Sequence, residues 1–493
     1  MTNAHVNKAS LIGGFIVLFV VLFFRNTSLG LSWLILGLGM VAVQHLSKPN
    51  SRKQRLYQLA LLVAGFAVFY HGNALAFFCF LAAYLVVAIG YQTSFSNPIF
   101  SVVIGWGNVM VSPISGLIRT ISKLGTQKDN NISKVMRYVL ITVAMLLVFG
   151  LLYTNVSPAF YIFLQDLDLG TGLELLFVAA LGSFICFNLL YQRFPEYFAR
   201  FMLQQEQIRD PEKVLKENSE SDDSLYQSRS EWIKPLSFGI FMVSVLLGIV
   251  IGTDLIELFS HQVEDFNHSN RLHNSVFALI VSVILAAMLG LWSIRSLNSK
   301  PIKVLKSANY LFLSLNIMYV VVNVLNNLDY IQAYGLSARR IGVFFYLSAC
   351  IVGLGFTLHN VNKELGIRTL FTQVSHALFI MFIAAGLIGW TRIITKYNLS
   401  HPPMAKHGII DYGYLHSLQG NSDLLYDHRM DMNEAQLERL EQKVEKAMRY
   451  EVLDIRKLCL SKEIEKRRLK ALDIKDNANE RVNESSTQHY ENQ

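Results

Sequence analysis

The chain has 493 residues, of which 52% are hydrophobic and 16% are charged, and its formal net charge is +8. A soluble domain carries about 25% charged residues, so this composition excludes an ordinary soluble protein. The basic residues stand between long apolar runs, where membrane topology places them, so the positive charge indicates no nucleic-acid partner.

Eleven apolar runs fill the chain between Ser10 and Trp390. A hydrocarbon core about 30 Å thick needs about 20 apolar residues for each helical crossing, and flanking aromatic or basic residues shorten that requirement. The sequence therefore predicts an all-α polytopic bundle of about eleven transmembrane helices. The expected spans are 10–24, 28–46, 56–70, 74–91, 138–154, 172–191, 235–253, 274–293, 308–325, 341–358 and 374–391.

The spans and the segments between them predict six regions. They are an N-terminal four-helix membrane segment over 1–92, an interfacial or cytoplasmic connection over 93–137, a main bundle over 138–391 with a flexible loop at 203–231, a fold-back motif segment over 392–430, an amphipathic helix over 431–475 and a polar, disordered tail over 476–493. The apolar residues of the connection are interrupted by Gly and Pro, which favours an interfacial or re-entrant piece over a crossing.

Clusters of Lys and Arg predict the orientation in the membrane. They occupy the connections after the second, fourth, sixth and eighth spans, and cytoplasmic loops carry this excess of positive charge. We therefore expect the N-terminus of this membrane protein to be cytoplasmic. Eleven crossings would leave the C-terminal tail outside.

The tail carries apolar residues at helical spacing with Glu and Lys around them. This pattern is typical of an amphipathic helix that covers one partner surface, so the helix over 431–475 is a candidate site for a protein partner. The residues of its apolar stripe are Leu437, Leu440, Val444, Ala447 and Met448.

One loop contains side chains that bind metals. On a helix, His261, Asp265 and His268 would share a face, with His273 nearby, and imidazole and carboxylate groups suit divalent transition metals. The competing interpretation is a solvated acidic loop with histidines at the membrane interface. Elsewhere the sequence predicts no catalytic residue, no cofactor motif and no cofactor.

Polar residues inside the spans are few. Asn316 and Asn323 are seven residues apart, so they fall on one face of the ninth predicted span. Hydrogen bonds between helices are the favoured interpretation for such amides.

A basic pair follows the ninth span. Ser337 can cap the next helix, and Arg339 and Arg340 in its first turn oppose the helix macrodipole. They therefore require an anionic partner, lipid phosphates or an acidic group of the protein, unless they simply anchor the chain at the interface. Carboxylates of the fold-back segment are the protein's own candidates. We expect Asp411, Asp423 and Asp427 to face Arg339, Arg340 and Arg392.

The two motif segments resemble a bacterial multi-pass family of unknown function, the domain-of-unknown-function 4153/4173 type. The similarity covers roughly residues 130 to 428 and leaves the first 90 residues and the tail helix outside. Ser337 stands where the family has Thr, and retains a capping hydroxyl. The matching residues are Tyr334, Gly335, Leu336, Arg339, Asn398, Asp411, Tyr414, Leu415, Leu418 and Asp423. The resemblance implies a polytopic helical fold and a location in the bacterial inner membrane, but it implies no reaction.

Three functions fit these observations. The leading hypothesis is a non-enzymatic integral membrane protein that acts as a sensor, scaffold or accessory subunit. The alternative is a transporter of a small anionic solute or lipid, with Arg339, Arg340 and Arg392 as the anion site. A metal-dependent membrane enzyme built on the histidine loop is the third.

Overall fold

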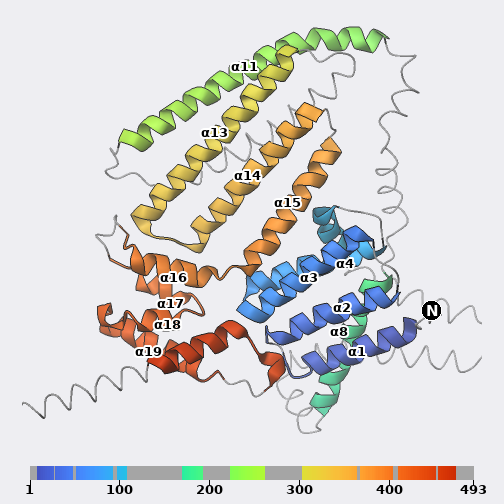
Figure 1. The fold of residues 1–493 in the computed structure, drawn as a ribbon, viewed down its shortest axis with the longest axis vertical. Helices are drawn as coiled ribbons and strands as arrows, with labels where there is room; N and C mark the ends of the chain where they lie inside the picture. The colour runs from blue at the N-terminus through green and yellow to red at the C-terminus, as the bar shows by residue number, and fades with distance from the viewer. Residues whose placement is uncertain are drawn as a thin grey trace, which may run out of the picture. The chain divides into compact units, whose positions relative to one another are not determined.

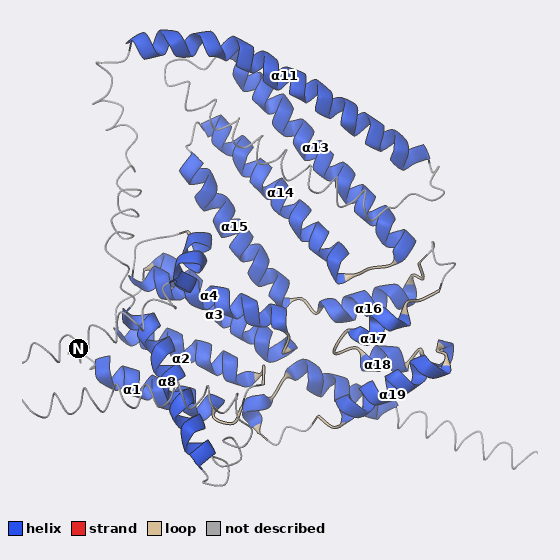
Figure 2. Ribbon diagram, turned by 180° about the vertical axis from the view of Figure 1, so that it is seen from behind, coloured by secondary structure: helices blue, strands red, loops and turns tan. Residues whose placement is uncertain are grey.

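The computed structural model describes residues 8–26, 28–47, 51–92, 97–107, 169–191, 223–260, 303–363, 367–403, 409–450 and 454–472. Every regular element in these ranges is a helix, and Figure 2 draws no strand among them. The chain divides into two compact units. Unit 1 contains residues 1–204, 383–387 and 451–463, and unit 2 contains residues 205–382, 388–450 and 464–493.

Four described helices are long and apolar enough to cross a membrane. Their apolar parts are Ser237–Ile256, Val304–Tyr334, Ala338–Lys363 and Thr369–Leu387. Shorter apolar helices cover Gly13–Phe23, Leu31–Leu46, Ala74–Gly90, Pro98–Gly107 and Glu174–Ser183. These helices indicate a membrane protein. The predicted spans 138–154 and 274–293 lie outside the described residues.

Unit 1 is built from helices of the N-terminal part of the chain. They are α1 (Lys8–Phe23), α2 (Leu31–Ser47), α3 (Arg52–His71), α4 (Ala74–Gln92) and α8 (Leu169–Tyr191). Helix α2 packs between α1 and α3, α4 packs on α3, and α8 packs on α1 (Figure 1).

Local chemistry sets the ends of α3. The Ser51 side chain accepts a hydrogen bond from the backbone N–H of Gln54 at the start. At the end, Gly72 adopts the left-handed conformation with φ of 59°. Such capped ends explain why the boundaries of α3 follow the Ser and Gly positions rather than the apolar run alone.

Unit 2 contains α11 (Asp223–Ser260), α13 (Lys303–Tyr334), α14 (Ala338–Lys363) and most of α15 (Ile367–Leu387). Helix α13 packs against both α11 and α14, and their shared core includes Phe312, Leu347 and Leu354 (Figure 1). A short turn over residues 335–337 joins α13 to α14 in a hairpin. The predicted flexible loop at 203–231 is wrong over its last nine residues, because α11 already begins at Asp223.

The helix of the last predicted span ends earlier than expected. Helix α15 ends at Leu387, and Gly389 has the non-helical angles φ −80° and ψ 68°. A new helix, α16 (Trp390–Ser400), then begins. The predicted span 374–391 therefore joined two helices that a glycine separates, since an apolar run alone contains no signal for such a break.

Three further helices follow α16 in unit 2. They are α17 (Tyr412–Ser417), α18 (Ser422–Tyr426) and α19 (Glu434–Met448). Ile394 of α16, Leu415 of α17, Leu425 of α18 and Leu440 of α19 belong to one buried apolar cluster. The fold-back predicted for residues 392–430 is thus a packed group of short helices, and α19 covers it.

The single amphipathic helix predicted over 431–475 is wrong. Helix α19 ends at Met448, a 3-10 turn covers Ile455–Lys457, and a separate helix covers residues 460–472. The Asp454 side chain accepts a hydrogen bond from the backbone N–H of Arg456 and so begins a turn. This local bond competes with helix continuation, and periodicity does not reveal it.

Candidate functional site

Polar side chains from separated segments of unit 2 meet around α18. We call this group the C-terminal cluster; its members are Arg392, Thr395, Asn421, Ser422, Asp423, Lys443, Glu465 and Arg468. Helices α16, α18 and α19 supply five of them, Asn421 directly precedes α18, and the helix over 460–472 supplies Glu465 and Arg468.

Asp423 is the buried anion of this cluster, with 4% of its side chain exposed. Its two carboxylate oxygens accept hydrogen bonds from the two terminal nitrogens of Arg392, both at 2.8 Å. Arg468 approaches the same carboxylate at 3.4 Å. A fork-to-fork pair of this kind is both strong and directional. The expected pairing of Arg392 with a carboxylate of the fold-back segment is therefore present.

Asn421 and Lys443 form the second half of the cluster. The amide nitrogen of Asn421 donates to the Thr395 hydroxyl at 2.7 Å and to the Leu415 carbonyl at 3.1 Å. Its amide oxygen accepts from the Lys443 ammonium. Lys443 also donates to the carbonyl oxygens of His416 and Leu418, at the end of α17. The Lys443 ammonium thus supplies donors to carbonyl groups at the end of α17, where the positive charge is also favoured by the helix dipole.

Glu465 connects the helix over 460–472 to α18. Its carboxylate accepts a hydrogen bond of 2.7 Å from the backbone N–H of Ser422, the first residue of α18. An anion at that helix terminus is favourable, because it meets both an unpaired N–H and the positive end of the helix dipole. The segment after α19 is therefore part of the site.

Burial lowers the pKa values of two basic groups here. It lowers the pKa of Lys443 to about 8, and the Glu465 carboxylate acts in the opposite direction. Burial also lowers the pKa of His416, with smaller contributions from the nearby charges of Lys443 and Arg439. The interior of the cluster thus disfavours additional positive charge.

The turn between α13 and α14 is held by a second set of motif residues. The side-chain amide of Asn398 accepts from the backbone N–H of Leu336 at 2.6 Å and donates to the Leu336 carbonyl at 2.8 Å. The Tyr414 hydroxyl accepts a hydrogen bond of 3.0 Å from the N–H of Ala338. Gly335 has φ of 83°, and because it lacks a Cβ it leaves room for the side-chain amide of Asn398. The hairpin turn is therefore fastened to α16 and α17.

The two arginines after this turn have different environments. Arg340 donates to the carbonyl oxygens of Tyr334 and Gly335, and its guanidinium lies 4.2 Å from the centre of the Tyr330 ring. It therefore caps the C-terminal end of α13 instead of meeting an aspartate. Arg339 is exposed, and within the described ranges no acidic side chain pairs with it.

The other predicted carboxylates have separate roles. Asp411 begins α17 by accepting a hydrogen bond of 3.0 Å from the N–H of Tyr414. Asp427 is exposed and forms no ion pair within the part of the chain that the structure describes. Among the aspartates expected to meet arginines, Asp423 forms an ion pair with Arg392.

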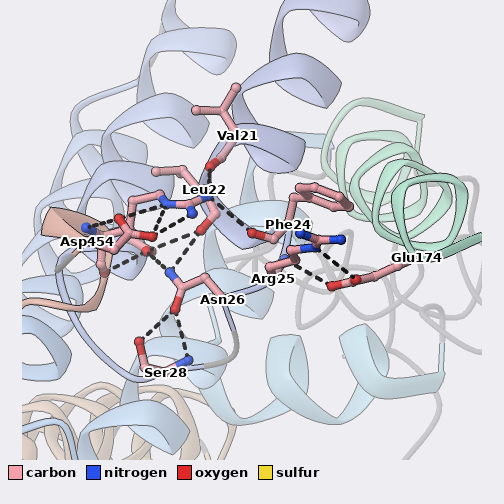
Figure 3. A network of polar contacts seen from close by, with 10 residues as sticks. Val21, Leu22, Phe24, Arg25, Asn26, Ser28, Glu174 and Asp454 are labelled. Atoms are coloured by element: carbon pink, nitrogen blue, oxygen red, sulfur yellow. Dashed lines mark hydrogen bonds and ion pairs between the residues drawn. The ribbon is translucent and has the colours of Figure 1, made fainter. Parts of the chain in front are cut away.

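A polar contact region in unit 1 involves the chain after α19. We call residues 454–461 the strap. Arg456 donates to the carbonyl oxygens of Val21 and Phe24 at the end of α1, and its own carbonyl accepts from Ser32 at 2.9 Å. Figure 3 shows the contacts of Asp454 beside Val21, Leu22 and Asn26.

The strap also reaches other helix ends in unit 1. The Leu458 carbonyl accepts from the N–H of Leu31 at 2.9 Å, where α2 begins. Cys459 donates to the Tyr70 carbonyl at 3.6 Å and Ser461 donates to the His71 carbonyl at 3.3 Å, where α3 ends. One segment thus satisfies polar backbone groups at the ends of three helices.

A family model described as a domain of unknown function, DUF4153, matches residues 12–427. The chain belongs to the DUF4153 family. No curated protein and no solved structure matches it. The DUF4153 match begins at residue 12, so the expectation that the first 90 residues lie outside the family was wrong. The strap and α19 lie beyond the matched residues.

The predicted metal ligands are not among the described residues. His261, Asp265, His268 and His273 all lie in the segment 261–302, outside the described part of this DUF4153 chain. Within the described ranges, no group of three His, Cys, Asp or Glu side chains is arranged to hold a metal ion.

Several members of the C-terminal cluster were not predicted as site residues from the sequence. They are Thr395, Asn421, Lys443, Glu465 and Arg468. Lys443 carried one usable signal: it stands between Leu440 and Val444 on the otherwise apolar stripe of α19. A lone lysine at such a position indicates a specific acceptor. The other four have no comparable signal, because their partners are distant in the sequence.

Proposed function

We propose that this DUF4153 protein is a non-enzymatic scaffold or accessory subunit of a bacterial inner membrane, with its docking surface on α19. The observation that carries this proposal is that the motif residues Gly335, Asn398 and Asp423 direct their contacts to the chain itself. Side chains committed to internal hydrogen bonds act as structural groups, and here they hold α16 to α19 in one packed module.

The outer face of α19 supports a docking role. Leu437, Leu440 and Val444 pack against the module's own core, so the apolar stripe already has its partner surface within the chain. The opposite face exposes Glu438, Glu441 and Glu445. A partner that binds this face would carry basic groups, and electrostatic complementarity would set its specificity more than its affinity.

A site-specific photo-crosslinker tests the docking proposal. Placed at Glu441, which is exposed, it should give one discrete adduct with a second protein in cells. Placed at Leu440, the buried neighbour, it should give none. Reversing Glu438 and Glu445 to lysine should abolish the adduct at 441 while the melting temperature changes by less than about 1 °C, because surface substitutions have small effects. Adduct yields that are equal at 440 and 441 would count against the proposal.

We further propose eleven spans, a cytoplasmic N-terminus and an external C-terminal tail. The strap supports this topology, because it contacts the end of α1, the start of α2 and the end of α3. One crossing by α1 places that end on the side opposite the N-terminus. The end of α15 also belongs there, since the Leu387 carbonyl lies 2.8 Å from the His71 imidazole. The number of spans from α1 to α15 is then odd.

Cysteine labelling of the full chain tests the topology. Met430, which is 90% exposed, and Lys53, at the start of α3, each become cysteine in separate variants. A membrane-impermeant maleimide should label Met430→Cys in intact spheroplasts, whereas Lys53→Cys should react only after permeabilisation. The parent chain provides the background. The opposite pattern would place the tail in the cytoplasm.

Transport of a small anionic solute or a lipid is a second candidate. Arg339 favours it, being an exposed cation in the first turn of α14, where the helix dipole also attracts anions. Arg392 supports it less, because Asp423 neutralises its charge. Anion uptake by reconstituted protein that Arg339→Ala abolishes would make transport the better account.

A further inference from the structure

Helix α13 carries a row of buried asparagines. Asn309, Asn316 and Asn323 are spaced seven residues apart, and Asn327 stands one turn after Asn323, so all four fall on one side of the helix. None is more than 2% exposed. They lie within Val304–Tyr334, a segment able to cross a membrane. We call this set the amide row.

Hydrogen bonds fix which way the amides point. The side-chain nitrogen of Asn323 donates to the Tyr319 carbonyl at 2.9 Å, and that of Asn316 donates to the Phe312 carbonyl at 2.8 Å. The nitrogen of Asn327 donates to the Arg340 carbonyl at 3.2 Å. A carbonyl oxygen can only accept, so these bonds identify the amide nitrogen in each case. The amide oxygens therefore point away from these bonds.

Two of these oxygens lack a donor. The side-chain oxygens of Asn323 and Asn327 are buried and have no hydrogen-bond partner within the part of the chain that the structure describes. The same holds for Asn360 of α14, whose nitrogen bonds the Phe356 carbonyl and Gln373. An unsatisfied buried acceptor destabilises the folded state, so leaving the oxygens of Asn323 and Asn327 dry would be unfavourable. The predicted hydrogen bond to another helix is wrong for Asn323, because its amide nitrogen bonds the Tyr319 carbonyl of its own helix.

We propose that the amide row binds small ligands that carry no negative charge and interact with the lone pairs of amide oxygens. Water is the occupant, bound through its O–H donors. An alkali cation, bound through its charge, is the other ligand that the same oxygens could hold. Neutral amide oxygens attract donors and cations and repel anions. The side chains of Asn323, Asn327 and Asn360 are buried and leave acceptors without a donor, and polar partners of this kind retain buried water. This inference does not depend on the scaffold role, and it separates the amide row from any anion path at Arg339.

Replacing Asn323 with leucine tests the proposal through stability. If a donor occupies the site, Asn323→Leu in the full protein in nanodiscs should lower the melting temperature by about 2–5 °C relative to Asn326→Leu. Asn326 is a half-buried neighbour on the same helix and provides the matched control. If the oxygen is dry, removing an unsatisfied group stabilises the protein. An equal or higher melting temperature for Asn323→Leu would therefore overturn the proposal.

A second measurement includes a wild-type readout that does not depend on how a variant folds. Hydroxyl-radical footprinting should oxidise Tyr319, which is 6% exposed and one turn from Asn323, at a rate that Asn323→Leu reduces at least threefold. No oxidation of Tyr319 in the wild type would contradict a hydrated row. Melting in NaCl, KCl and choline chloride then distinguishes the occupants. A melting temperature that rises with Na⁺ or K⁺, and no longer does so in Asn323→Leu, identifies a cation. Equal melting temperatures in the three salts, together with oxidation of Tyr319, identify water.

Discussion

Asp423→Asn is expected to reduce the free energy of unfolding of the module formed by α16 to α19 by about 2–4 kcal/mol. Removing one partner of a buried ion pair costs about 3–5 kcal/mol, because the remaining charge is left uncompensated. We reduce that range because 32% of the Arg392 side chain and 53% of the Arg468 side chain reach solvent, which screens their charges. The substitution keeps the shape of the side chain, so the loss reports the charge.

Hydrogen exchange of α18 measures this effect locally. Opening of the module should become about 30- to 1000-fold more frequent, since each factor of ten corresponds to about 1.4 kcal/mol. Asp427→Asn is the matched control, because Asp427 is exposed only four residues away and should change the stability by less than about 0.5 kcal/mol. Similar exchange in the two variants would show that the Arg392 pair contributes little.

Gly335→Ala is expected to lower the stability of unit 2 by about 2–4 kcal/mol. A side chain at φ of 83° is strained by about 1 kcal/mol or more. The added Cβ would also lie 2.7 Å from the amide oxygen of Asn398. That oxygen cannot move aside freely, because Asn398 bonds both backbone groups of Leu336.

Thermal unfolding in detergent compares this variant with Gly342→Ala. Gly342 lies inside α14 with open space at its Cβ position, so alanine there should stabilise the helix by about 0.5–1 kcal/mol. The two alanine variants should therefore move the melting temperature in opposite directions. A shift of the same sign and size in both would remove the special role assigned to the turn.

In the described ranges the apolar runs predicted where helices form, but they did not predict where those helices end. Helix α11 begins at Asp223 within a polar segment, and α15 ends before Gly389 within an apolar one. Hydropathy reports the surroundings of a side chain, whereas a helix ends where backbone groups find other partners. Such partners are local caps or distant residues, and only the local caps have a signature in the sequence.

The site was predictable where opposite charges in nearby segments had to meet. Arg392 and Asp423 form that pair. For Arg340 the sequence predicted either an anionic partner or an interfacial anchor, and the structure supplies the carbonyl oxygens of Tyr334 and Gly335. Every residue has a carbonyl group, so composition does not distinguish this solution. Lys443 and Glu465 depend on how α19 and the following helix return to α18, which periodicity does not encode.

The strap has a consequence for the biogenesis of this protein. Arg456 follows Val21 by 435 residues, and its guanidinium satisfies the carbonyl oxygen of Val21 at the end of the first helix. At about 5–20 residues per second, a ribosome needs roughly 20–90 s to translate that interval. The carbonyl groups at the end of α1 therefore remain without these donors through nearly all of synthesis. A message cut short before codon 456 would yield a chain in which α1 never receives them.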